Sequence, residues 1–189
     1  MQNTPFNDNP NLKVILHNQP ESSDALVKQL LDRERDLFID VVVPDHPSIL
    51  GEPLKQEKIC VIASQDHPRL SNDSISMTEF LTEPYIKFNR TRDNRAGIQS
   101  FTQAYIHDLN IVAYSQSIFE IMVLVSQTDK ISTLSVEMAE YYRDKLGLKI
   151  YQLPFSSSRV NLYMLWHKAL NNNSGHQWLR NQLRQLYTR

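Results

Sequence analysis

One apolar run near the N-terminal end constrains the fold of this chain more than any other feature. Residues 36–43 read Asp-Leu-Phe-Ile-Asp-Val-Val-Val, and Pro44 ends the run. A nearly continuous apolar stretch of this length is typical of a strand that is buried on both faces in a parallel sheet. We expect a short strand over residues 12–16 and a capped helix over residues 21–33 to precede it.

The rest of the chain alternates between short apolar runs and segments with helical spacing, a pattern that favours parallel strands. The expected strands are residues 50–54, 58–64, 85–88, 110–114, 130–134, 148–153 and 160–167. The expected helices are residues 76–81, 97–107, 117–127, 136–146 and 175–187, with Gly147 ending the fourth of these. The sequence pattern changes after Pro68, and residues 160–167 form an expected return strand. Together these features predict two α/β lobes. They comprise residues 11–63 with 161–189, and residues 64–160. Two strands cross between them beside a hinged cleft.

Charge and composition exclude several functions. Twenty Lys and Arg against twenty-one Asp and Glu leave no basic excess, so direct DNA binding by this chain is disfavoured. The single cysteine, Cys60, excludes an internal disulfide and a cysteine zinc cluster. No apolar run approaches the roughly 20 residues that span a bilayer, and residues 1–12 are too polar for a signal peptide. These features predict a cytoplasmic protein without membrane contact.

Catalytic and cofactor motifs are missing from the sequence. The four glycines are isolated, so they form no nucleotide-binding loop, and no Gly-x-Ser-x-Gly motif occurs. Six histidines are scattered without metal-ligand spacing; His67 is expected in a turn and His176 near the surface. Cys60 lies inside an apolar run, where burial would raise its pKa. We therefore expect no enzyme, no metal and no cofactor.

Helix starts and one basic cluster are the remaining candidates for binding. Ser117 begins the apolar helix 117–127, whose free N–H groups and dipole would favour a small anion. Ser22 stands at the start of the first helix, where simple capping is the competing interpretation. Arg90, Arg92 and Arg95 either hold an anion or form a solvated charged loop.

Three segments, taken in order, resemble the effector-binding domain of LysR-type transcriptional regulators. They are the strand 35–39 (Arg-Asp-Leu-Phe-Ile), the segment 61–68 (Val-Ile-Ala-Ser-Gln-Asp-His-Pro) and the return strand 162–167 (Leu-Tyr-Met-Leu-Trp-His). The closing segment 175–180 (Gly-His-Gln-Trp-Leu-Arg) is similar to the branch of this family that includes LeuO and NodD. The resemblance covers residues 11–186.

The resemblance implies an α/β fold of two Rossmann-like lobes, of the type II periplasmic-binding-protein kind, joined by two crossing strands. It also implies a small-molecule effector between the lobes, a homo-oligomer, and control of transcription through a DNA-binding domain that is absent from this chain. The family domain begins with one more strand and helix, and residues 1–10 are too short and polar to supply both.

Effector-binding positions are carried over from the family by their place in the pattern. Ser22, Pro44 and Asp45 belong to the first lobe, and Ser64 to the expected crossing. The second lobe contributes a larger set that follows its strands: Phe88, Asn89, Gln116, Ser117, Ser132 and Thr133.

Two other functions fit a two-lobed α/β chain. A solute-binding component of a transporter shares the architecture, but it normally needs a signal sequence for export. A two-lobed enzyme should show a coherent acid–base or nucleophile cluster, and none is visible in the sequence.

Overall fold

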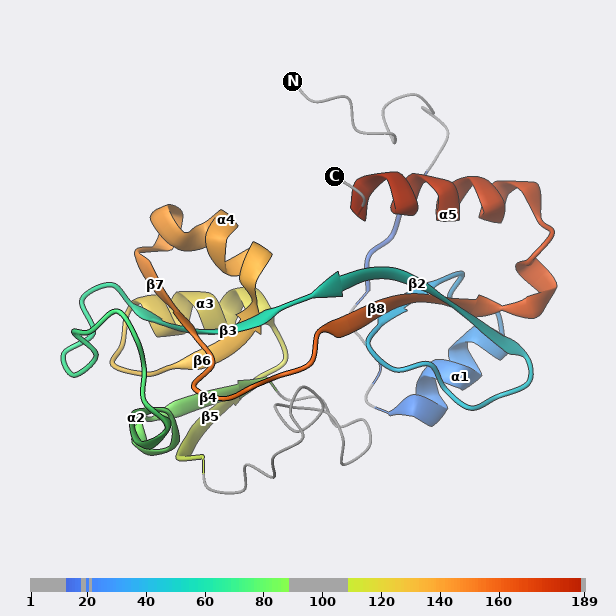
Figure 1. Cartoon of the computed structure of the whole chain (residues 1–189). Coiled ribbons are helices and arrows are strands. Elements are labelled where there is room, and N and C mark those ends of the chain that lie inside the picture. The colour runs from blue at the N-terminus through green and yellow to red at the C-terminus, as the bar shows by residue number, and fades with distance from the viewer. Residues whose placement is uncertain (1–12, 18–19, 21, 89–108, 188–189) are drawn as a thin grey trace. The chain divides into compact units, whose positions relative to one another are not determined.

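A computed structural model describes residues 13–17, 20, 22–88 and 109–187 of the chain. These residues form two compact units (Figure 1). Unit 1 takes its described residues from Met1–Lys55 and Leu162–Arg189, and unit 2 takes its own from Gln56–Asn161. The chain leaves unit 1 inside strand β2 (Ile49–Glu57) and returns inside strand β8 (Val160–His167).

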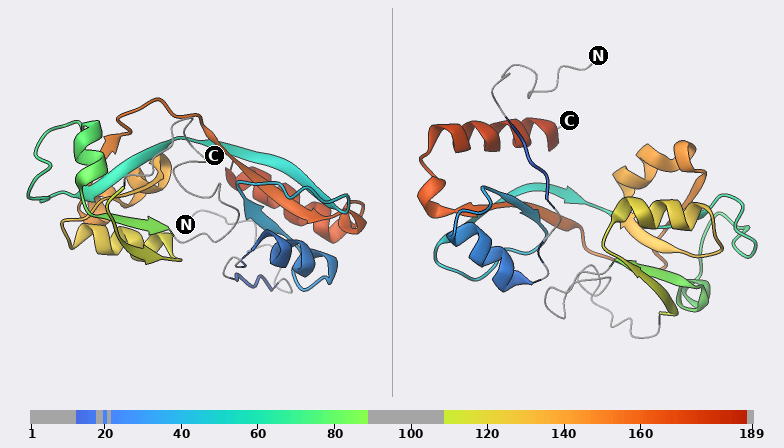
Figure 2. Two further views of the ribbon diagram at one scale, coloured as in Figure 1. Left: turned by 90° about the horizontal axis from the view of Figure 1, so that it is seen from below. Right: turned by 180° about the vertical axis from the view of Figure 1, so that it is seen from behind.

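Unit 1 is a three-stranded sheet between two helices. The strand order is β1 (Phe38–Asp40), β8 and β2, and β1 pairs with β8 in antiparallel register. Helix α1 (Ser23–Leu31) and helix α5 (Ser174–Tyr187) lie on opposite sides of this sheet (Figures 1 and 2). A 3-10 helix, Lys168–Leu170, links β8 to α5.

The two faces of the unit 1 sheet are covered by different kinds of side chain, apolar on the α1 side and polar on the α5 side. Ser22 caps α1 by accepting a hydrogen bond from the Ala25 N–H, and two leucines of α1 are completely buried. The apolar cluster on this side comprises Leu26, Leu30, Phe38, Ile49 and Leu165. On the other side, the two buried side chains of α5 are His176 and Arg180.

The apolar run 36–43 forms a much shorter strand than predicted. Only Phe38–Asp40 is extended, because the Asp40 Oδ1 accepts hydrogen bonds from the N–H groups of Val41 (2.6 Å) and Val42 (3.4 Å) and turns the chain. The strand pairs antiparallel to β8, and Val42 and Val43 after it are exposed. The predicted strand 12–16 is also wrong, since its described residues have no strand pairing and Leu16 is 90% exposed.

Unit 2 combines antiparallel and parallel strands. In the first sheet β3 (Ile59–Ser64) lies between β6 (Ser132–Ser135) and β7 (Leu148–Gln152), antiparallel to both. In the second, β4 (Tyr85–Phe88) and β5 (Ile111–Ser115) are parallel. A parallel bridge between Tyr85 and Ile131 joins the two sheets, so β4 lies between β5 and β6.

Helices cover both faces of the unit 2 sheets (Figure 1). Helices α3 (Ile118–Ser126) and α4 (Val136–Leu146) pack on one core, which includes Cys60, Ile62 and Ile86. Helix α2 (Met77–Thr82) packs on the other core through Phe80. Burial raises the pKa of Cys60 to about 12, as predicted for an inert core thiol.

The α/β class predicted from the sequence is confirmed. Strands β4 and β8 and helix α4 have the predicted boundaries, and Gly147 ends α4 in the left-handed conformation. Parallel pairing is confirmed for β4 with β5 and, through the Tyr85–Ile131 bridge, for β4 with the start of β6. Strand β3 instead runs antiparallel to both of its neighbours. The predicted helix 97–107 lies outside the described residues.

Among the glycines that the structure describes, Gly51 on β2 has the tightest surroundings. A Cβ atom at this position would lie 2.8 Å from Val43 Cγ1 and 3.2 Å from Leu165 Cδ2. We predict that Gly51→Ala lowers the free energy of unfolding by about 1 kcal/mol, because the loop that carries Val43 must move away. Urea unfolding followed by tryptophan fluorescence measures this effect in unit 1, which holds both tryptophans.

Gly175→Ala is the matched control in the same unit. Its new Cβ would meet only Asn173 Oδ1, at 3.4 Å, and an alanine favours the first turn of α5. The control should be neutral or slightly stabilising. Equal losses for the two variants would contradict the steric explanation.

Candidate functional site

The carboxyl ends of the parallel strands form the first candidate site in unit 2. Strands β4 and β5 end at Phe88 and Ser115, and β6, which runs parallel to β4, ends at Ser135 on the same edge. Strands β5 and β6 lie on opposite sides of β4, so the strand order reverses at β4. Such an edge is the usual ligand position in open α/β sheets.

Side chains of the chain itself already satisfy the start of α3. The Ser117 Oγ accepts a hydrogen bond from the Glu120 N–H (3.2 Å), and the Ser115 Oγ accepts one from the Ser117 N–H (3.0 Å). The Ser115 hydroxyl donates to Glu120 Oε2 at 2.7 Å. Ser117 is therefore a helix cap, and the Glu120 carboxylate occupies the positive end of the helix dipole.

The start of α4 on the same edge has a similar arrangement. Ser135 caps this helix by accepting a hydrogen bond from the Met138 N–H at 3.3 Å, and Glu137 lies in its first turn. An anion that approached either helix start would meet a carboxylate of the chain.

The two predicted positions on β6 point to opposite faces of the sheet. Ser132 is buried and its hydroxyl donates to the Ile86 carbonyl at 2.7 Å. Thr133 Oγ1 shares a 2.6 Å hydrogen bond with the Tyr85 hydroxyl, whose pKa burial raises to about 12. Both hydroxyls have partners inside the fold, and neither lies at the carboxyl edge.

Ser64 lies at the opposite edge of the sheet from Ser117. Because β3 runs against β6, its last residue is beside the amino ends of the parallel strands. The Ser64 hydroxyl donates to the carbonyl of Ser126, the last residue of α3, at 3.1 Å. Ser64 and Ser117 therefore mark opposite ends of one helix.

The remaining predicted positions lie in unit 1 or outside the described residues. Ser22 is the cap of α1, and Pro44 and Asp45 belong to the loop after β1. Asn89 lies outside the described residues. Within unit 2 the structure brings together Phe88, Gln116 and Ser117, and it separates them from Ser64, Ser132 and Thr133.

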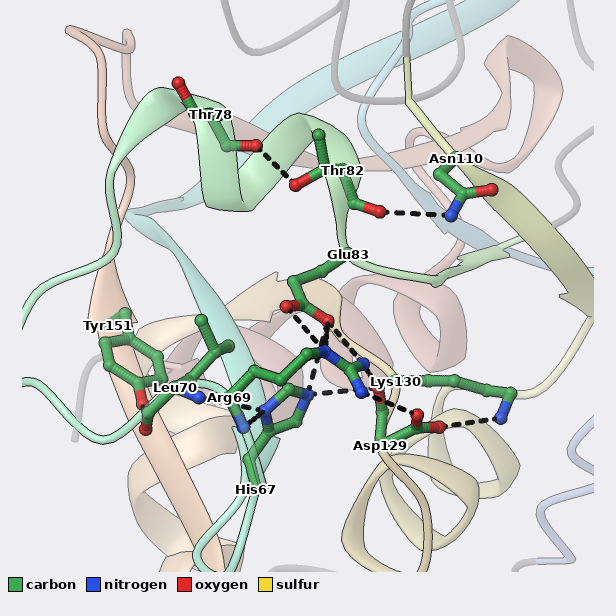
Figure 3. A network of polar contacts seen from close by, with 10 residues as sticks. All are labelled: His67, Arg69, Leu70, Thr78, Thr82, Glu83, Asn110, Asp129, Lys130 and Tyr151. Carbon is green, nitrogen blue, oxygen red and sulfur yellow. Dashed lines mark hydrogen bonds and ion pairs between the residues drawn. The ribbon is translucent and has the colours of Figure 1, made fainter.

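A polar network lies at the amino edge of unit 2 and was missed in the sequence (Figure 3). The His67 Nδ1 accepts hydrogen bonds from the N–H groups of Arg69 (3.3 Å) and Leu70 (3.2 Å). Its Nε2 therefore carries the proton and donates to the Asp129 carbonyl at 3.0 Å. His67 is buried rather than a simple turn residue, and this neutral tautomer is the one that its partners require.

The side chain of Arg69 binds the carboxylates of Glu83 and Asp129, which belong to two other chain segments, next to His67 (Figure 3). Its Nε and Nη2 donate to Glu83, with the shortest contact at 2.6 Å, and its Nη1 donates to Asp129 Oδ2 at 3.0 Å. Glu83 is 6% exposed, and hydrogen bonds from Arg69 and Lys130 lower the pKa of Asp129. His67 and Glu83 each precede a proline, the one local sign of such a position. Because the groups satisfy one another, the network is a structural clamp.

In residues 13–17, 20, 22–88 and 109–187, no three His, Cys, Asp or Glu side chains gather in a way that could hold a metal ion. None of the helices in this same part of the chain is long and apolar enough to cross a membrane.

Comparison with known proteins gives one consistent result. A family model described as the LysR substrate binding domain matches residues 7–188. The transcriptional regulator LeuO of Escherichia coli strain K12 is 23% identical over 92% of this chain and 54% of its own length. Nodulation protein D of Azorhizobium caulinodans is 25% identical over 71% of this chain and 42% of its own length. The chain thus spans about half the length of the curated relatives it matches.

Solved structures agree at the level of the fold. The effector-binding domain of QuiR, solved in complex with shikimate, has a TM-score of 0.69 and 20% sequence identity to this chain. The similarity covers 88% of this chain and 78% of that domain.

The clamp at the amino edge predicts that its two ion-pair partners, Arg69 and Glu83, differ in how much stability is lost when each is replaced. Arg69→Met leaves the buried Glu83 carboxylate without its cation and should cost about 3 kcal/mol of unfolding free energy. Glu83→Gln leaves a half-exposed arginine that water can reach, so we expect a loss of about 1 kcal/mol. Urea unfolding followed by circular dichroism measures both variants.

Lys130→Met provides the control for this comparison. Lys130 pairs with Asp129 at 3.2 Å, but both side chains are partly exposed. Its loss should cost less than about 0.5 kcal/mol. A cost for Glu83→Gln that equals or exceeds that of Arg69→Met would show that Glu83 burial does not set the energetics.

Proposed function

The chain belongs to the LysR substrate-binding domain family, and from this premise we propose that it is the effector-sensing domain of a LysR-type transcriptional regulator. The match over residues 7–188 carries the proposal, because it covers both units of the fold. The two units would then be the two regulatory subdomains. Binding of a small molecule would change transcription through the regulator as a whole.

DNA would be bound by a part of the regulator that is not in this chain. The near-zero net charge offers little phosphate neutralisation, and the matched relatives are about twice as long. The relatives are named as regulators, which disfavours the transporter component as an alternative. A cytoplasmic location, the absence of catalysis and the absence of membrane contact remain part of the proposal.

We place the effector contacts of unit 2 at its carboxyl edge, on Phe88, Gln116 and Ser117. Those of unit 1 would be Ser22 and the loop with Pro44 and Asp45. The position between two lobes, and the contacts of Ser64, Asn89, Ser132 and Thr133, stay predictions from the sequence.

The charge of the effector is constrained by the two helix starts at this edge. Glu120 and Glu137 already neutralise the positive dipole ends of α3 and α4, so a neutral molecule with hydroxyl groups fits this edge better than an anion. An anionic effector, as the sequence suggested, would need a cation nearby. Arg90, Arg92 and Arg95 follow Phe88 in the sequence and could supply it.

Effector binding is testable with a metabolite library screened by thermal shift. For a metabolite that stabilises the chain, Ser117→Ala should weaken binding about fivefold in titration calorimetry, the equivalent of one hydrogen bond of about 1 kcal/mol. Crystals soaked with the same metabolite should show it beside Phe88 and Gln116.

Ser76→Ala is the matched control, because it removes the cap of α2, a helix that ends next to Glu83 at the amino edge. Both variants should lose about 1 kcal/mol of stability, and only Ser117→Ala should lose affinity. Metabolite bound solely on outer surfaces, or unchanged affinity in Ser117→Ala for a molecule at this edge, would contradict the assignment.

Self-association is the second expectation of the proposed function. Residues Val14, Ile15 and Leu16 are apolar, exposed and outside any strand pairing, so a second copy could cover them. We predict an apparent mass in light scattering that rises with protein concentration, and a smaller rise for Leu16→Asp. The same preparations should show no sequence-selective binding to duplex DNA.

Met77→Asp is the control for the scattering series, since Met77 is an exposed apolar residue of α2 in unit 2. It should leave the concentration dependence unchanged. A strictly monomeric mass at high concentration would refute the association, and a salt-resistant, sequence-selective gel shift would refute the DNA prediction.

A further inference from the structure

Helix α5 is held on the unit 1 sheet by an unusual pair of buried side chains. His176 is 6% exposed and Arg180 is 5% exposed, and they are the two buried residues of this 14-residue helix. The leucines on α5 are only partly buried, whereas the opposite face of the sheet has a complete apolar cluster. The attachment of α5 therefore depends strongly on polar contacts.

Both ring nitrogens of His176 have partners, and the partners require opposite roles. The Nε2 lies 2.9 Å from the Asp36 carbonyl, an acceptor, so Nε2 must carry a proton. The Nδ1 lies within hydrogen-bond distance of Arg180 Nη1, a donor, so Nδ1 must be unprotonated. The observed packing fits only the neutral imidazole with its proton on Nε2.

Arg180 connects this imidazole to β8 and to the turn before α5. Its guanidinium carbon lies 4.4 Å from the centre of the Trp166 ring, and its Nη2 donates to the Asn171 carbonyl at 2.9 Å. No carboxylate of the described residues forms an ion pair with it within 4.0 Å. A second cation beside this guanidinium would therefore be strongly unfavourable.

We propose that His176 is an acid-sensitive latch: a proton taken up at Nδ1 removes the acceptor that holds Arg180 and releases α5 from β8. The proton occupies the lone pair that accepts the Arg180 hydrogen bond, so that bond is lost and two cations face each other. The Trp166–Arg180 stack then opens, and the N-terminal half of α5 leaves the sheet.

The charged groups around His176 set the direction of its titration. Burial lowers the pKa of His176, and the Arg180 charge on the same helix lowers it further, while the Asp36 segment before β1 opposes them. Farther along α5, Arg184 is paired with Glu52 of β2 at 2.7 Å, so Glu52 does not neutralise Arg180 directly. The net effect keeps the folded imidazole neutral.

The sign of the pH effect follows from this direction. The unfolded histidine has a pKa of about 6.5 and binds a proton more readily than the folded one. The latch therefore contributes its full stability above about pH 6.5 and loses it as the pH falls through the lower pKa of the folded state. Acid should loosen unit 1 before it affects the carboxylates of unit 2.

Hydrogen exchange of the whole chain tests the latch, with α4 of unit 2 as an internal reference. Between about pH 7.5 and about pH 5.5, a range above the ordinary carboxyl pKa values, α5 amides should lose protection relative to α4 amides. Tryptophan fluorescence should change over the same range, because Trp166 and Trp178 both belong to unit 1.

His176→Gln is the decisive variant, because a glutamine amide can donate to Asp36 and accept from Arg180 but cannot titrate. We expect this variant to keep α5 protected at about pH 5.5. His46→Gln, at a partly buried histidine of the same unit, should respond to acid like the wild type. Equal acid responses of His176→Gln and the wild type, or equal loss of protection in α4, would overturn the proposal.

A direct titration of the wild type keeps the test valid if His176→Gln does not fold. Nuclear magnetic resonance of the His176 ring should show protonation at the pH at which α5 amides become unprotected. Loss of α5 protection while the ring is still neutral would refute the latch, as would protonation of the ring without any loss.

Discussion

The structure of unit 2 depends on how it stabilises one buried carboxylate, that of Glu83. Glu83 is buried just before β4 begins, and its charge is stabilised there because Arg69 donates a bidentate pair of hydrogen bonds to it. The same guanidinium holds Asp129 at the approach to β6, and His67 adds its own bond to that segment. Three chain segments are thereby held together at the amino edge, at the starts of β4 and β6.

Elements with strong local signals could be predicted from the sequence. Helix α4 has a capping serine before it and Gly147 after it, and β8 combines apolar length with aromatic residues. The run 36–43 misled because hydropathy does not report the local hydrogen bonds of Asp40, which turn the chain after three extended residues. Hydropathy also does not report pairing partners, so the antiparallel direction of β3 was not visible.

The candidate site was predictable only in part, for the same physical reason. Ser117 could be placed at a helix start, since capping is a local property of Ser followed three residues later by Glu. The position of Ser64 depends on which way β3 runs beside β6, and that is a long-range choice. The roles of His67 and His176 depend in part on carbonyl groups more than sixty residues away, those of Asp129 and Asp36, which a local pattern does not identify.

The order in which the units can be completed during synthesis follows from the path of the chain. Unit 2 is one continuous stretch, whereas unit 1 is closed by β8, the middle strand of its sheet, which is made after the whole of unit 2. On a ribosome that works from the N-terminus, β1 and β2 have no shared neighbour until residues 160–167 emerge. Until then the first-made half of unit 1 holds two strands whose backbone N–H and C=O groups still lack the strand that will pair with them.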